Sequence, residues 1–202
     1  RIQGHTDIGL NDTGRWQAQR LAQALADEPL AAVYSSDLSR AHDTARGLAR
    51  SGGLPVRLDT GLRERHFGAF EGQTFHDIEQ RWPELSARWR QRDPAFGPPG
   101  GETLGDFYER CVATATRLAA QHAGQSIALV AHGGVLDCLY RAATRITLNA
   151  PRSWQVGNAS INRLLYTPQG FTLVGWSDTS HLDSSRDEFS DGATDALPQP
   201  QS

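Results

Sequence analysis

The sequence predicts an α/β fold built around a parallel sheet, and three observations support this class. Residues 127–131 form a short, apolar and partly β-branched run, as expected of a strand buried on both faces of a parallel sheet. Residues 31–36, 37–50 and 56–59 alternate as strand, helix and strand. Two apolar runs around the turn at 168–170 predict an antiparallel pair. At 202 residues the chain is long enough for one core, so we expect a single domain.

The first helix is expected near residues 14–26, where apolar residues recur at helical spacing. Asn11, Asp12 or Thr13 is expected to cap it, because such side chains accept hydrogen bonds from the free N–H groups of a first helical turn. Residues 1–12 before it are loop-like.

Residues 60–101 are polar, rich in Arg and aromatic residues, and end in GPPGGE. We expect them to form an insertion over the active-site end of the sheet, with helices near 74–81 and 84–92. A long helix is expected over 102–122, started by Glu102 or Thr103. Polar residues rich in Pro, Ser and Asp predict a disordered tail over 184–202.

Composition excludes several classes of function. A net charge of −3 argues against a nucleic-acid partner, and no apolar run is long enough for a membrane span. The chain contains neither GxxxxGK[ST] nor GxGxxG, so we expect no nucleotide cofactor, and its histidine spacings match no metal site. Cys111 and Cys138 lie in apolar helical patterns and are expected to be buried thiols, which fits a cytoplasmic protein.

His132 lies where a predicted strand meets a predicted helix, and Gly133 and Gly134 follow it. A helix N-terminus at the carboxyl end of a strand offers unpaired N–H groups and partial positive charge, which suits a phosphate. The alternative is a histidine bonded to a backbone carbonyl in a tight turn.

Two further residues carry candidate chemistry. Arg40 lies about one turn into the helix after residues 31–36, where its planar fork could pair with phosphate oxygens. The alternative is a surface arginine paired with Asp37 or Asp43. Glu64 follows another strand and would be a general acid if burial raised its pKa, unless it belongs to a charged loop with internal salt bridges.

Five segments taken together are far more specific than any one of them. In order, GHTDIGLNDTG, SSDLSRAHDTA, LRERHFGAFEG, GGET and VAHGG resemble the histidine phosphatase superfamily over about residues 1–180. The resemblance implies a three-layer α/β sandwich: a mostly parallel central sheet with an antiparallel edge and helices on both faces. It also implies a phosphohistidine mechanism without a metal or other cofactor.

The resemblance also assigns roles to residues at matching positions. Arg40 is similar to a phosphate-binding arginine, Glu64 to the proton donor and His132 to the second active-site histidine. Gly133 and Gly134 then lie beside the phosphate. Gln3 and Gly4 match a stretch that contacts substrate in the mutase branch.

The family begins with a strand ending in Arg-His-Gly, whose histidine is the nucleophile, and this chain lacks that motif. We therefore expect the domain, residues 1–183, to be incomplete at its N-terminus, with Arg1 just downstream of the nucleophile. That nucleophile must be neutral, while His132 is expected to be cationic. Activity is then expected to be highest at acidic to neutral pH and insensitive to chelators.

The expected activity is hydrolysis of a small phosphorylated metabolite by a monomer or homodimer. Phosphoglycerate-mutase-type transfer is the first alternative, disfavoured because the insertion over 60–101 is short for that branch. A catalytically inactive fragment that binds a phospho-ligand is the second. Arg88, Arg90 and Arg92 could recruit an anionic substrate tail, although a solvated helical face is the simpler interpretation.

Overall fold

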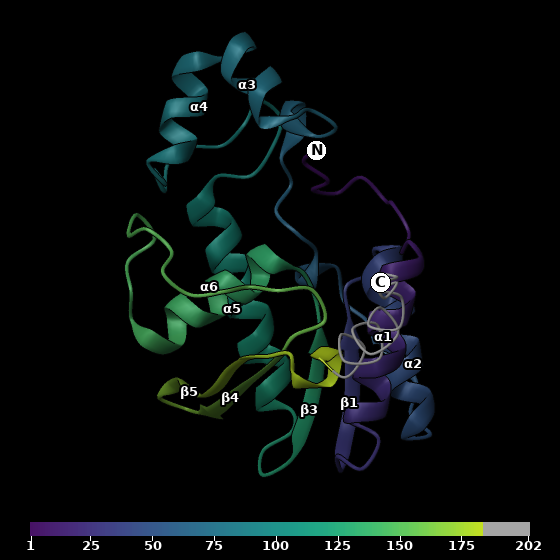
Figure 1. Ribbon diagram of the computed structural model, residues 1–202. Helices are drawn as coiled ribbons and strands as arrows, with labels where there is room; N and C mark the ends of the chain where they lie inside the picture. The colour runs from purple at the N-terminus through teal and green to yellow at the C-terminus, as the bar shows by residue number, and fades with distance from the viewer. Residues whose placement is uncertain (184–202) are drawn as a thin grey trace, which may run out of the picture.

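Three parallel strands form the central sheet of the protein (Figure 1). In the computed structural model, which describes residues 1–183, β1 (Leu30–Ser35) lies between β2 (Val56–Leu58) and β3 (Ser126–Val130). Because parallel strands end at the same edge of a sheet, the residues that follow β1 and β3 meet there.

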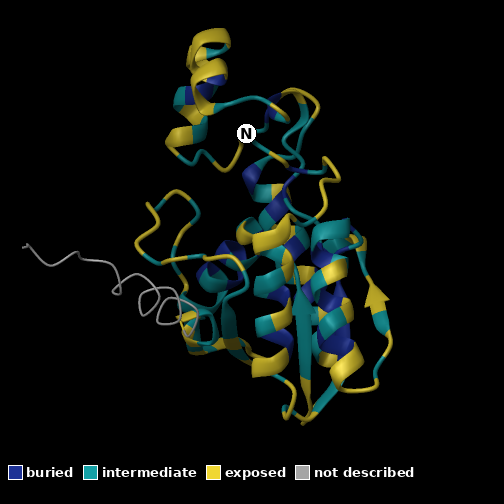
Figure 2. Cartoon of the chain, turned by 45° about the vertical axis from the view of Figure 1, so that its right-hand side comes forward, coloured by how far each residue is buried: buried dark blue, intermediate teal, exposed yellow. Residues whose placement is uncertain are grey.

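Helices cover both faces of this sheet, which gives three layers. On one face α2 (Ser39–Ser51) packs against the strands and α1 (Asp12–Ala24) packs on α2. On the other face lie α5 (Leu104–Ala120) and α6 (Gly133–Thr144). Alternation along the strands explains the arrangement: Val33 of β1 faces α2, whereas its neighbours Ala32 and Tyr34 face α5. Figure 2 shows the buried positions concentrated where helices and strands meet.

The segment between β2 and α5 lies beyond the carboxyl ends of the strands (Figure 1). It contains two short 3₁₀ turns, η1 (Thr60–Leu62) and η2 (Gly68–Phe70), and two helices, α3 (Phe75–Arg81) and α4 (Pro83–Arg90). Its apolar centre is formed by buried side chains of η2, α3 and the segment after α4, namely Phe70, Ile78 and Phe96.

The antiparallel pair β4 (Ile161–Thr167) and β5 (Gly170–Asp178) is confirmed, with a turn at residues 168–169. It differs from the expected antiparallel edge, because within residues 1–183 it forms a separate sheet that pairs with no central strand. The pair instead packs its apolar face on α5 and α6.

β3 differs from expectation in its burial. Residues 127–130 are half-buried, although their apolar run predicts burial on both faces. The reason is that β3 pairs with β1 along one edge, while no strand of residues 1–183 pairs with its other edge. The strand therefore presents an apolar edge with free backbone groups.

Helix starts follow local chemistry closely. Asn11 caps α1, its side-chain oxygen accepting a hydrogen bond from the Gly14 N–H at 2.8 Å. Thr103, and not Glu102, caps α5.

Cys111 and Cys138 are buried and free, as expected. No helix of the described part of the chain is both long and apolar enough to cross a membrane. The predicted disordered tail, residues 184–202, lies outside the described residues.

Candidate active site

His132 lies at the carboxyl end of the sheet, where the chain passes from β3 into α6. Its backbone is extended and directly precedes the first turn of α6. Its ring Nε2 is 2.8 Å from the Oγ of Ser36, the residue that follows β1, and the residue is only 8% exposed. The partner is thus a hydroxyl from the neighbouring strand, so the interpretation as a histidine bonded to a backbone carbonyl is wrong.

Burial first, and then the nearby positive charge of Arg40, lower the pKa of His132 to about 3. The imidazole is therefore neutral at pH 7 in the ligand-free protein, and the cationic His132 expected for the complete, phosphate-bound enzyme stays a prediction. A neutral ring can donate one hydrogen bond and accept one. Binding of a phosphate dianion would favour the protonated form.

Glu64 has its carboxyl group buried against the first turn of α6, the helix that His132 directly precedes. Its Oε2 accepts a hydrogen bond from the Gly134 N–H at 3.0 Å, and its Oε1 accepts one from the Arg65 N–H at 2.9 Å. Burial raises the pKa of Glu64, and these two N–H groups and Arg40 oppose that rise without cancelling it. The side chain therefore holds a proton at higher pH than an ordinary glutamate.

The arginines on either side of Glu64 do not pair with its carboxylate. Arg63 makes a two-pronged ion pair with Asp37, with contacts of 2.7 and 2.6 Å. Arg65 is buried and donates to the carbonyls of Phe96 and Glu102. Neither arginine therefore closes the stretch with a salt bridge of its own, although His66 Nε2 lies 3.8 Å from Glu71 Oε1 within it.

Glycine is required at position 134 because Glu64 occupies the space beside it. A Cβ on Gly134 would lie 2.2 Å from Glu64 Oε1 and 3.1 Å from the ring of Phe107. A Cβ on Gly133 would only contact Val156 at 3.6 Å. Close packing of the Glu64 carboxyl group against the N-terminus of α6 thus depends on Gly134 and not on Gly133.

Arg40 extends from the first turn of α2 toward the N-terminal segment. Its Nη1 donates to the carbonyl of Thr6 at 3.0 Å and its Nη2 to the carbonyl of Gly4 at 2.9 Å. Asp37 is bound by Arg63, and Asp43 lies 3.6 Å from Arg46, so the alternative of a surface arginine paired with either aspartate is wrong. The guanidinium is half-buried near Glu64, and burial lowers its pKa.

The segment around Gly4 is fixed by the insertion. Ile2 exchanges backbone hydrogen bonds with Gly72 and Gln73. Gly4 is buried with a positive φ of 54°, and a Cβ there would lie 2.2 Å from Glu71 Oε1. Gly4 thus reaches the site through its carbonyl, whereas the neighbouring Gln3 is exposed.

Three residues of the site were not singled out from the sequence, although His5 and Ser36 lie within the segments GHTDIGLNDTG and SSDLSRAHDTA. His5 places its Nε2 2.8 Å from the carbonyl of Glu64 and stacks on His66, with ring centroids 4.7 Å apart. Ser36 contacts His132 as described. Arg110 of α5 donates to the carbonyls of Gly61, Arg63 and Glu64 and pairs with Glu102. These contacts hold the loop that carries Glu64.

The site therefore combines a guanidinium, a buried imidazole, a buried carboxyl group with a raised pKa and the N-terminus of a helix. The guanidinium, the imidazole and the helix N-terminus suit an oxyanion, and the carboxyl group can donate or accept a proton. Such a set is suited to phosphoryl transfer, in which charge stabilisation and positioning dominate.

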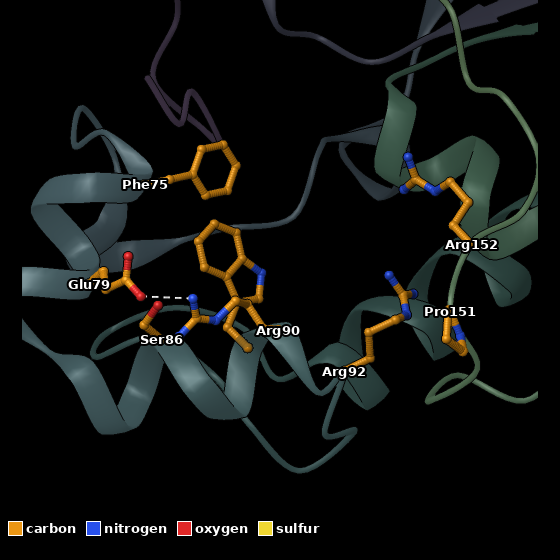
Figure 3. Close-up of a pocket in the computed structure, with 8 residues that line it drawn as sticks. Phe75, Glu79, Ser86, Arg90, Arg92, Pro151 and Arg152 are labelled. Atoms are coloured by element: carbon orange, nitrogen blue, oxygen red, sulfur yellow. Dashed lines mark hydrogen bonds and ion pairs between the residues drawn. The ribbon is translucent and has the colours of Figure 1, made fainter.

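Arg88 and Arg90 keep 48% and 61% of their side chains exposed, which fits the solvated helical face, and each nevertheless pairs with a carboxylate. Arg88 pairs with Asp93, Arg90 with Glu79 (Figure 3) and Arg92 with Asp137. Arg92 lies beyond the end of α4 and adopts a positive φ of 54°.

Comparison with known proteins gives consistent matches. Residues 1–179 match the family described as "Histidine phosphatase superfamily (branch 1)". "Phosphoglycerate mutase-like protein 4" of Arabidopsis thaliana is 39% identical over 189 residues, which cover 92% of this chain and 81% of that protein. "Metal-independent phosphoserine phosphatase" of the same organism is 35% identical over 187 residues, 91% of this chain and 77% of that protein.

A solved structure gives the same result in three dimensions. The structure of a mycobacterial glucosyl-3-phosphoglycerate phosphatase with VO3 superposes with a TM-score of 0.78 at 32% identity, covering 89% of this chain and 91% of that one. Two of these three relatives therefore bear the names of phosphatases.

Proposed function

Because this chain belongs to the histidine phosphatase superfamily, we propose that it hydrolyses small phosphate monoesters through a phosphohistidine intermediate and without a metal ion. The observation that carries the proposal is the buried carboxyl of Glu64 at the N-terminus of α6, the helix that His132 precedes, with the charge of Arg40 acting on both groups. A proton donor next to an oxyanion site is what cleavage of a phosphate ester needs.

His132, Arg40 and the N–H groups at the start of α6 bind the phosphoryl oxygens in this proposal. A histidine nitrogen attacks phosphorus in line, the bond from phosphorus to the ester oxygen breaks, and Glu64 gives its proton to the leaving oxygen. Glu64 then takes a proton from water, whose oxygen attacks phosphorus and releases the histidine with inorganic phosphate. Gly133 borders the phosphate, and Gly4 holds Arg40 toward it.

We assign the nucleophile to a histidine upstream of Arg1, on a strand that pairs with the second edge of β3. Two observations support this assignment. The printed sequence holds no Arg-His-Gly motif. The half-buried apolar run of β3 also has a free edge within residues 1–183, and a further parallel strand would cover it.

Hydrolysis is preferred to mutase-type transfer because two of the relatives reported above are named as phosphatases. A mutase must also retain its product while the phosphoryl group returns. The assay below separates the two, since a mutase releases little inorganic phosphate. The same assay distinguishes a phosphatase or a mutase from an inactive fragment that binds a phospho-ligand, because such a fragment shows no turnover.

The test is hydrolysis of p-nitrophenyl phosphate, with and without EDTA, by the 202-residue chain and by a version extended upstream to include the Arg-His-Gly strand. Turnover only in the extended form, unchanged by EDTA, is the expected result. Equal turnover in both forms would show that the nucleophile lies within residues 1–202. Loss of turnover with EDTA would overturn the metal-independent mechanism.

A further inference from the structure

The hydroxyl group of Ser36 is fully buried at the end of β1 and has two polar neighbours within residues 1–183. Its Oγ accepts a hydrogen bond from the Leu38 N–H at 3.3 Å and lies 2.8 Å from His132 Nε2. The backbone of Ser36 is paired elsewhere, because its carbonyl accepts from the Ser35 hydroxyl and its N–H donates to the Val130 carbonyl. Of the two neighbours of Oγ, His132 Nε2 is therefore the one that can accept a proton.

These contacts fix where the proton of the imidazole lies. A serine hydroxyl carries one proton, and a neutral imidazole carries one proton on either of its two nitrogens. Since a buried hydroxyl proton without an acceptor costs free energy, the Ser36 O–H donates to His132 Nε2. Nε2 is then unprotonated, and the proton of the neutral ring lies on Nδ1.

The other protonation states of His132 fit the same contacts less well. With a proton on Nε2, this N–H and the Leu38 N–H would both donate to Ser36 Oγ, and the buried Ser36 proton would have no acceptor within residues 1–183. The doubly protonated ring has the same defect. Three cationic or titratable groups also oppose its charge, whereas one carboxylate favours it: Arg40 of α2, His5 of the N-terminal segment and Arg110 of α5 against Asp37.

Nδ1 is the ring nitrogen that remains for a ligand. It has no hydrogen-bond partner within residues 1–183, and it is not sealed from solvent. Fewer bonds separate Nδ1 than Nε2 from the His132 backbone, which directly precedes the first turn of α6. A protonated Nδ1 adds a donor to those of Arg40 and of the helix N-terminus, whereas an unprotonated Nδ1 would turn a lone pair toward the oxygens of an anion.

We propose that Ser36 is a positioning residue of the phosphate site, whose hydroxyl keeps the proton of His132 on Nδ1 so that the neutral ring presents an N–H to an incoming phosphoryl oxygen. The last step rests on the proposed function, because it uses the same phosphate site. Ser36 acts through His132 and contacts no phosphate itself. A ring held in this tautomer binds an anion as a donor without first taking up a proton.

The test is the nitrogen-15 NMR spectrum of the histidine rings in the 202-residue chain at pH 7 without phosphate. The signals of His132 are identified as those that His132→Gln lacks. In a neutral ring the protonated and unprotonated nitrogens resonate far apart, and their couplings to the two ring C–H protons distinguish Nδ1 from Nε2. We expect a protonated Nδ1 and an unprotonated Nε2 for His132. A protonated Nε2 overturns the proposal.

Two alanine variants connect the tautomer with Ser36. Ser36→Ala leaves Nε2 without its donor, so the ring is expected to populate both tautomers and its two nitrogen signals to move toward each other. Ser35→Ala is the matched control, because it removes a neighbouring buried hydroxyl that bonds to the Ser36 carbonyl at 2.8 Å, and it is expected to keep the wild-type His132 signals. Unchanged signals from the other histidines show that a variant retains the fold. A pure Nδ1 tautomer in Ser36→Ala overturns the proposal.

Calorimetric binding of inorganic phosphate tests the consequence for the site. Ser36→Ala is expected to bind phosphate about tenfold more weakly than the wild type, because a hydrogen bond to the anion is no longer held in place, whereas Ser35→Ala keeps the wild-type affinity. Equal affinity in all three proteins rejects the role of Ser36 and leaves the phosphate site standing. Failure of phosphate to bind the wild type, or binding unchanged by Arg40→Gln, overturns the proposed function instead, whichever tautomer the spectrum shows.

Discussion

The carboxyl group of Glu64 accepts a hydrogen bond from the backbone N–H of Gly134, 3.0 Å away, in the first turn of α6. Two residues 70 positions apart thus bring a proton donor to the helix end where a phosphate would bind. Burial of the carboxyl raises its pKa, and the helix N-terminus limits that rise. Because burial and the helix N-terminus act on its pKa in opposite directions, the Glu64 carboxyl group is suited to donate a proton in one step of the proposed reaction and to take one up in the next.

Glu64→Gln is expected to reduce turnover of p-nitrophenyl phosphate by about 10²- to 10⁴-fold in the form that contains the nucleophile. The same substitution is expected to raise the free energy of unfolding at neutral pH. Because the folded pKa of Glu64 is raised from 4.5, its favourable contribution is present below pH 4.5 and is lost as pH rises through the folded pKa. Above that pH the wild-type protein must bury a charge, whereas Gln stays neutral.

Urea unfolding of both proteins between pH 4 and pH 8 measures this difference. The stability of Glu64→Gln relative to wild type is expected to rise with pH. A constant difference across the range would show that Glu64 ionises in the folded protein as an ordinary glutamate does.

Gly134→Ala is expected to abolish most activity, because the added methyl group would lie 2.2 Å from Glu64 Oε1 and must displace the carboxyl. Gly47→Ala, in α2 and outside the site, is the matched control, since its methyl group meets only Ala22 Cβ at 3.7 Å. Overpacking at position 134 should cost about 1–3 kcal/mol of stability. Steady-state kinetics and thermal unfolding of the two variants test this, and equal activity in both would contradict the role of the contact.

Sequence patterns predicted the strand ends and the helix starts because these are local. The end of β3 at Val130, two residues before His132, follows from an apolar run, and the cap of α1 at Asn11 follows from a side chain that caps. The motifs also predicted the superfamily, which the match over residues 1–179 confirms.

The contacts within the site could not be predicted, since they join distant segments. Arg110 supports the Glu64 loop from the middle of α5, where no motif marks it. The charge state of His132 depends on burial and on Arg40, which lies 92 positions earlier, so a resemblance to a family could not supply it. The separate β4–β5 sheet likewise reflects packing on α5 and α6.

Gly4→Ala is expected to weaken inorganic phosphate binding, because the carbonyl of Gly4 holds Arg40. The substitution places a side chain at a positive φ of 54° and against Glu71 Oε1, at a cost of about 1–3 kcal/mol. Gly9→Ala is the control: its methyl group would have only Ser39 Oγ within reach, at 3.9 Å. Calorimetry with phosphate should separate the two variants, and wild-type affinity in Gly4→Ala would show that Arg40 does not depend on this carbonyl.

His132 should make the protein sensitive to acid. Its pKa is about 3 in the folded protein and 6.5 when unperturbed, so between these values the unfolded state binds more protons. The stabilising contribution of the neutral ring is therefore present above pH 6.5 and is lost progressively as pH falls toward 3.

At pH 4.5 this linkage amounts to about 3 kcal/mol, from two pH units at 1.36 kcal/mol each. His132→Gln cannot take up a proton, so its free energy of unfolding should fall less steeply between pH 6.5 and pH 4.5 than that of the wild type. His76→Gln changes an exposed histidine of α3 and should retain the wild-type slope. Urea unfolding across this range decides the matter, because equal slopes for wild type and His132→Gln would mean that the buried ring takes up its proton without cost. The neutral His132 assigned to the ligand-free site would then be wrong.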